Sequence, residues 1–68
     1  MQQIVLKIGS KPSEFYFPQN EIGFEGIREV ISDIMHSEKE AEMASKWCEN
    51  ASLGDKYEKA EFNLEIRA

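Results

Sequence analysis

Hydrophobic and polar side chains alternate near both ends of the chain, which is the pattern of a strand with one buried face. The first alternating segment covers residues 4–8, and its apolar positions are Ile4, Leu6 and Ile8. The last covers residues 62–67, and its apolar positions are Phe62, Leu64 and Ile66. We therefore expect a strand at each of these places.

The segment that follows the first strand predicts a hairpin. Gly9 and Pro12 have the backbone preferences of a turn, and residues 14–17 are rich in aromatic side chains, which favour strands. Pro18 ends this second strand because proline cannot donate a ladder hydrogen bond. By alternation Tyr16 faces the uncovered side of the sheet, where it either shields the open face or belongs to an interface.

From Phe24 onward the hydrophobic positions recur at the spacing of an amphipathic helix. They are Phe24, Ile27, Val30, Ile31, Ile34 and Met35. Asn20 is a candidate N-cap, and we expect the helix to begin between residues 21 and 24. Gly23 and Gly26 should leave its first turn loose.

A second helix is predicted from a capping box. In this motif the Ser37 hydroxyl accepts the backbone N–H of Glu40, and the Glu40 side chain reaches back to the backbone N–H of Ser37. This helix either starts afresh after a bend or continues the first one with a kink. Trp47 is interpreted as a core anchor or as a partly exposed contact residue, and Gly54 as the helix stop. The small residues of the expected packing face are Ala41, Ala44, Cys48 and Ala51.

The order of these elements predicts a single small α+β domain over residues 1–68 with the arrangement ββααβ. Each strand is apolar on one side only. We therefore expect a three-stranded, mostly antiparallel sheet with both helices on one face.

The charge of the chain is concentrated on its helical segment. The sequence carries 13 acidic and eight basic residues, a net charge of −5. Residues 21–49 hold eight of the acids and three of the bases, and the remaining residues hold five of each. Four of the acids follow one another at intervals of four residues. On a helix this spacing places them in a row that winds slowly along one face. We call these residues the acidic ridge: Glu21, Glu25, Glu29 and Asp33.

The acidic ridge is interpreted as a docking face for a basic partner protein or as a mimic of a phosphate backbone. The alternative is a solvated helix face that only keeps a small protein in solution. The acidic balance argues against direct binding of nucleic acid, which needs basic residues to neutralise phosphates.

Residue types needed for most catalytic or cofactor sites are scarce. No glycine-rich phosphate loop is present, and one histidine with one cysteine cannot build a standard zinc site. His36 and Cys48 would have to meet from two different helices to act as base and nucleophile. We therefore expect a protein that is not an enzyme and that uses no cofactor and no metal.

The apolar runs are too short to span a membrane, and the first residues lack the pattern of a secretory signal. A lone cysteine is typical of a reducing compartment. We therefore expect a cytoplasmic protein.

The stretch from Ala44 through Trp47-Cys48 and Ala51 to Gly54-Asp55-Lys56-Tyr57 forms a helix-turn-strand ending. It resembles the ending of small open reading frames from bacterial phages and mobile elements. The size, acidity and ββααβ order are also similar to some phage-encoded inhibitors of bacterial defence, including anti-CRISPR proteins. This resemblance implies occupation of a nucleic-acid-binding surface on a host protein.

Our leading hypothesis is a non-enzymatic binding module whose acidic ridge, with Tyr16 as a further contact, meets a basic surface of a host protein. The alternative is a structural or accessory subunit, or a homodimer, whose acidity serves only solubility.

Overall fold

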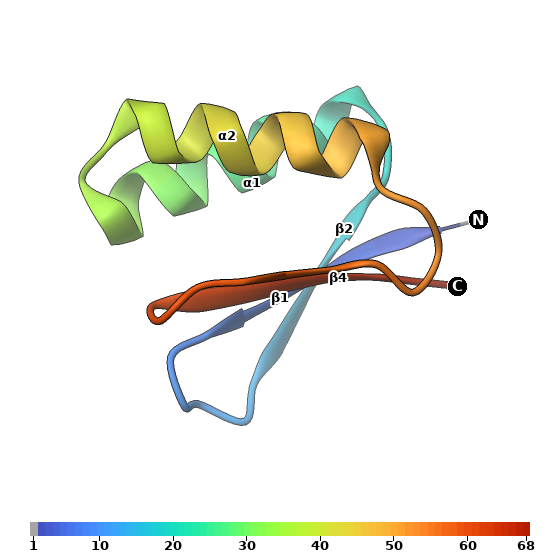
Figure 1. Cartoon of the computed structure of the whole chain (residues 1–68), viewed down its shortest axis with the longest axis horizontal. Helices are drawn as coiled ribbons and strands as arrows, with labels where there is room; N and C mark the ends of the chain where they lie inside the picture. The colour runs from blue at the N-terminus through green and yellow to red at the C-terminus, as the bar shows by residue number, and fades with distance from the viewer. Residues whose placement is uncertain (1) are drawn as a thin grey trace.

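The structure, a computed structural model, describes residues 2–68 as a sheet covered on one face by two helices (Figure 1). The elements follow in the order β1 (Gln3–Ile8), β2 (Glu14–Pro18), α1 (Glu21–Met35), α2 (Glu38–Asn50), β3 (Lys56–Glu58) and β4 (Phe62–Arg67). The helices run side by side in one layer, and β1 and β4 are neighbours in the middle of the sheet. The predicted α+β class and the covering of one sheet face by both helices are confirmed.

The sheet has four strands, not the three expected from the sequence. The strand order is β2-β1-β4-β3, and every neighbouring pair is antiparallel. The additional strand β3 has three residues, of which only Tyr57 is hydrophobic, so it is too short to show a period of two. A tight return joins it to β4, where the Lys59 N–H donates to the Phe62 carbonyl at 2.9 Å.

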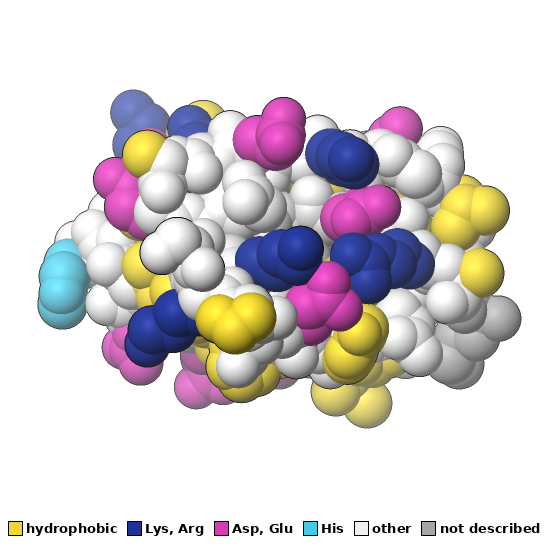
Figure 2. Space-filling model, turned by 90° about the horizontal axis from the view of Figure 1, so that it is seen from below, with side chains coloured by type: hydrophobic (Ala, Val, Ile, Leu, Met, Phe, Trp, Pro, Cys, Tyr) yellow, Lys and Arg dark blue, Asp and Glu magenta, His cyan; other side chains and the backbone are white. Residues whose placement is uncertain are grey.

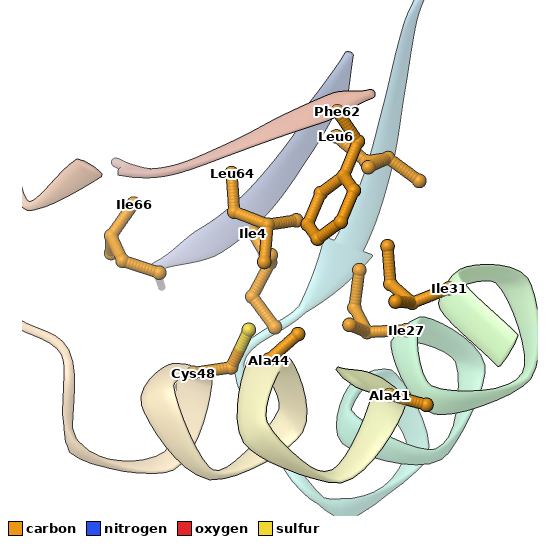
Figure 3. Packing of buried hydrophobic residues seen from close by; sticks show 10 residues of the cluster. All are labelled: Ile4, Leu6, Ile27, Ile31, Ala41, Ala44, Cys48, Phe62, Leu64 and Ile66. Atoms are coloured by element: carbon orange, nitrogen blue, oxygen red, sulfur yellow. The ribbon is translucent and has the colours of Figure 1, made fainter. Parts of the chain in front are cut away.

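The core lies between the sheet and the helices, and the small face of α2 lets that helix approach closely. Ala44 and Cys48 point from α2 toward the apolar side chains of the sheet (Figure 3). Trp47 packs half-buried against the core, with its ring centroid 5.3 Å from that of Tyr57. The fully buried cluster consists of Ile4, Leu6, Ile27, Ile31, Ala41, Ala44, Cys48, Phe62, Leu64 and Ile66.

The side chains predicted as caps hold the N-termini of both helices. The Asn20 side chain accepts the Gly23 N–H, and the Ser37 hydroxyl accepts the Glu40 N–H, each at 3.2 Å. Between the helices His36 adopts a left-handed conformation with φ of 51°. A left-handed residue cannot continue a helix, so α2 is a new helix that starts after a sharp turn.

The end of α2 differs from the prediction, because the helix stops at Asn50 and not at Gly54. The side-chain amide of Gln19 donates to the carbonyl oxygens of Cys48 and Ala51, both at 2.9 Å. These bonds satisfy carbonyl groups that a longer helix would have to pair itself. Gly54 instead occupies the turn before β3, with φ of 89°.

The first turn of α1 is tightly packed, whereas the two glycines near it predicted a loose one. A Cβ built on Gly23 would lie 1.6 Å from the carbonyl oxygen of Pro18. At this point α1 and the end of β2 therefore touch backbone to backbone. A Cβ on Gly26 would meet the ring of Phe17 at 2.9 Å. Both glycines thus allow α1 to lie against β2.

Candidate functional site

A groove lies between α1 and α2 on their solvent-exposed side. Its volume is about 720 Å³. The short connection between the helices brings the C-terminal half of α1 beside the N-terminal half of α2. The residues that line the groove are Arg28, Glu29, Ser32 and Asp33 from α1, and Glu38, Lys39, Ala41 and Glu42 from α2.

Four carboxylates, two from each helix, gather along this groove. We call it the acidic groove, and its carboxylates belong to Glu29, Asp33, Glu38 and Glu42. With the two cations that also line it, the lining residues carry a net charge of −2. Each helix contributes its two acids at an i,i+4 spacing, an arrangement that costs an isolated helix a few tenths of a kcal/mol.

The carboxylates of the acidic groove are not neutralised by the two cations beside them. Within residues 2–68, none of the four takes part in an ion pair of 4.0 Å or less. Arg28 donates instead to the Ser45 hydroxyl at 3.4 Å, and this hydroxyl donates to the Phe24 carbonyl at the same distance. The acidic groove therefore presents exposed negative charge to the solvent.

The structure separates the five residues predicted to contact a partner. Glu29 and Asp33 line the acidic groove, whereas Glu21 and Glu25 are exposed on the N-terminal half of α1 outside it. Tyr16 is opposite Val5 in the register of β1 and β2, on the sheet face that no helix covers. These residues consequently do not form one continuous site.

Glu38 and Glu42 were missed as site residues by reasoning from the sequence. The excess of acids in residues 21–49 was visible, but the spacing rule finds neighbours on one helix only. Their place beside Glu29 and Asp33 depends on how the two helices pair. The sharp turn at His36 makes the two helices antiparallel (Figure 1). The signal in the sequence is the short connection between the two predicted helices, which ends at the Ser37 cap.

The open face of the sheet carries a network of ion pairs. The Arg67 guanidinium donates to both carboxylate oxygens of Glu14, at 3.1 and 3.0 Å, and to Glu65 at 3.2 Å. Lys7 adds an ion pair to Glu14 at 3.6 Å. Figure 2 shows basic and acidic side chains lying next to each other across the middle of this face. The charges of this face therefore compensate one another, unlike those of the acidic groove.

Tyr16 is fixed within this network, because its hydroxyl donates to Glu14 at 2.6 Å. Hydrogen bonds from Arg67 and Tyr16 lower the pKa of Glu14 from 4.5 to about 2. The same bond raises the pKa of Tyr16, because its proton is held by a carboxylate. Val5 lies beside Tyr16 and is only 2% exposed, so the network shields an apolar residue on the open face.

Cys48 and His36 are placed too far apart to act as nucleophile and base. His36 lies before α2, which begins at Glu38, and Cys48 lies in the last turn of α2, roughly 15 Å from Glu38 along the helix at 1.5 Å per residue. Burial raises the pKa of the Cys48 thiol to about 12, so the thiol stays protonated at neutral pH. Cys48 and His36 therefore do not form a catalytic pair of nucleophile and base.

Among residues 2–68, no three side chains of His, Cys, Asp or Glu are grouped closely enough to hold a metal ion. Neither α1 nor α2 has the length and apolar composition that a helix needs to cross a bilayer. Comparison with protein-family models, with curated proteins and with solved structures gave no match.

Proposed function

We propose that this chain is a non-enzymatic binding module whose acidic groove docks on a basic surface of another protein. The observation that carries the proposal is the convergence of four carboxylates from two helices, none of which forms an ion pair with another residue in the described range 2–68. Glu21 and Glu25 extend the negative charge along α1 beyond the acidic groove. Lysine and arginine side chains of a partner have the charge that this surface accepts.

The specific form of the proposal is an inhibitor of the anti-CRISPR type, which occupies a surface that otherwise binds nucleic acid. Such a surface is rich in lysine and arginine because it neutralises phosphates. Exposed carboxylates repeated along the two helices offer these cations an alternative to the phosphate backbone. Bound nucleic acid and this chain would then exclude each other from the partner.

The competing explanation is that the acids only keep a small chain in solution, in an accessory subunit without a charged binding site. The two explanations differ in where the charge matters. Solubility depends on net charge and is insensitive to position, whereas docking depends on the carboxylates of the acidic groove. Variants with equal net charge and different positions therefore separate them.

The groove variant replaces three carboxylates at almost constant size: Glu29→Gln, Asp33→Asn and Glu42→Gln. Glu38 is retained because a negative charge in the first turn of α2 interacts favourably with the helix dipole, so removing it would destabilise the helix. The control variant removes the same number of charges from exposed acids outside the groove: Glu49→Gln, Glu58→Gln and Glu61→Gln.

Each protein is immobilised and exposed to a bacterial lysate, and bound proteins are eluted with a salt gradient. We expect the wild type and the control variant to retain the same protein, which salt releases and which nucleic acid displaces. The groove variant should retain much less of it. Equal retention on all three proteins, or elution that does not depend on salt, would contradict the proposed docking.

A further inference from the structure

The two edges of the sheet differ in how well they are protected against pairing with another strand. At one edge β3 has three residues and carries charged side chains on both sides of Tyr57. At the other edge β2 has five residues and exposes two aromatic side chains, Phe15 at 48% and Tyr16 at 57%. Short charged strands resist edge-to-edge pairing, whereas longer apolar ones invite it.

The register of the sheet identifies the backbone groups that β2 leaves unpaired. The Gln19 N–H donates to the Gln2 carbonyl at 3.3 Å, so this pair is a hydrogen-bonded one. Antiparallel ladders alternate hydrogen-bonded and non-hydrogen-bonded pairs. Residues 15 and 17 therefore bond to β1, while the N–H and C=O groups of Glu14 and Tyr16 point outward.

The end of this edge is covered. The first turn of α1 lies against the Pro18 carbonyl at Gly23, and proline has no N–H to offer. The accessible part of the edge is therefore the stretch from Glu14 to Phe17, in which two residues each present one donor and one acceptor.

We propose that β2 pairs antiparallel with β2 of a second copy of this chain, about a twofold axis at Phe15. In this register Glu14 of each copy is opposite Tyr16 of the other, and the outward groups form four main-chain hydrogen bonds. A register centred on Tyr16 would need the Pro18 carbonyl, which α1 covers. The proposed register is thus the one that uses every accessible backbone group of the edge.

The side chains near the axis are compatible with a second copy. Phe15 would lie directly opposite its own copy in a non-hydrogen-bonded pair, with Cα atoms about 4.5 Å apart, which covers the exposed aromatic ring. On the other face the charge of Glu14 is already compensated by Arg67 and Lys7. No uncompensated charge therefore has to enter the interface. This inference is independent of the proposed docking of the acidic groove.

The test places a charged side chain at position 15, on the proposed twofold axis, and then mixes two variants whose charges are opposite. Sedimentation equilibrium from roughly micromolar to millimolar concentration should show the wild type moving from one chain, 7.8 kDa, toward twice that mass. Phe15→Lys and Phe15→Glu should each remain monomeric, because like charges meet at the axis. An equimolar mixture of the two variants should regain the dimer, which a merely misfolded variant would not do.

Leu53→Lys serves as the matched control, since Leu53 is 56% exposed and lies in the loop after α2, outside the strand β2. It should dimerise like the wild type. Salt should strengthen the dimer, because each copy carries a net charge of −5, whereas salt should weaken docking to a basic partner. A wild type that stays monomeric, a Phe15→Lys variant that still dimerises, or a mixture that does not regain the dimer would overturn the proposal.

Discussion

Replacing Gly23 by alanine should destabilise the protein strongly, although alanine is the better helix former. The added Cβ would lie 1.6 Å from the Pro18 carbonyl oxygen. An ordinary contact of carbon with oxygen is about 3.3 Å, so the backbones of α1 and β2 must separate by roughly 1.7 Å. Neither group is the end of a movable side chain, and the short connection from β2 to α1 leaves little room to adjust.

The size of the effect follows from two opposing terms. Overpacking typically costs about 1–3 kcal/mol, and a clash between two backbones belongs at the upper end of this range. The helix propensity of alanine recovers about 1 kcal/mol. We expect a net loss of about 2 kcal/mol in the free energy of unfolding, which lowers the Tm of a domain this small by roughly 8–16 °C.

Gly26→Ala is the matched control, because it gives the same gain in propensity three residues further along the helix. Its Cβ would meet only the ring of Phe17, at 2.9 and 3.0 Å. A ring can turn at a cost of about 0.5–1.5 kcal/mol, so its Tm should stay within a few degrees of the wild type. Thermal unfolding followed by circular dichroism measures both variants. A Gly23→Ala protein that melts at or above the wild-type Tm would refute the close approach of α1 and β2.

Three further predictions concern the core and the open sheet face. Ala44→Leu should lower the free energy of unfolding in urea by about 1–3 kcal/mol, because Ala44 is fully buried between α2 and the sheet; an unchanged value would mean that α2 lies further from the sheet. The Cys48 thiol, with its pKa raised to about 12, should resist a thiol reagent in the native protein and react quickly in denaturant, and rapid native labelling would contradict its burial. Glu14 has a folded-state pKa lowered from 4.5 to about 2, so its contribution to stability is present above pH 4.5 and is lost as the pH falls toward 2. Glu14→Gln should flatten this acid limb of the stability profile, and a variant that keeps the acid limb of the wild type would argue against the Arg67 contact.

The parts of the fold that the sequence predicts are those in which local pattern and packing agree. Period-two segments gave β1 and β4, and the side chains of Asn20 and Ser37 gave the starts of both helices. In contrast, β3 is too short to show a period and exists because the chain returns along β4. The end of α2 depends on the Gln19 amide, which comes from a distant part of the chain.

The same distinction applies to the candidate site. The spacing of acids along one helix predicted that Glu29 and Asp33 lie next to each other on one face, because residues four apart on a helix are neighbours. Their neighbours Glu38 and Glu42 belong to the other helix, and only the paired helices bring the four together. Tyr16 was correctly placed on the open sheet face by alternation, but its bond to Glu14 ties it to a different surface from the acidic groove.

The most direct test of the docking proposal is the association rate constant with the captured partner, measured by stopped flow over a range of salt concentrations. Electrostatic steering raises such rates by roughly 10- to 1,000-fold and is lost as salt screens the charges. We predict a steep fall with salt for the wild type and the control variant, and a slower, flatter profile for the groove variant. Identical rates and identical salt dependence for all three proteins would contradict a role for the acidic groove in binding.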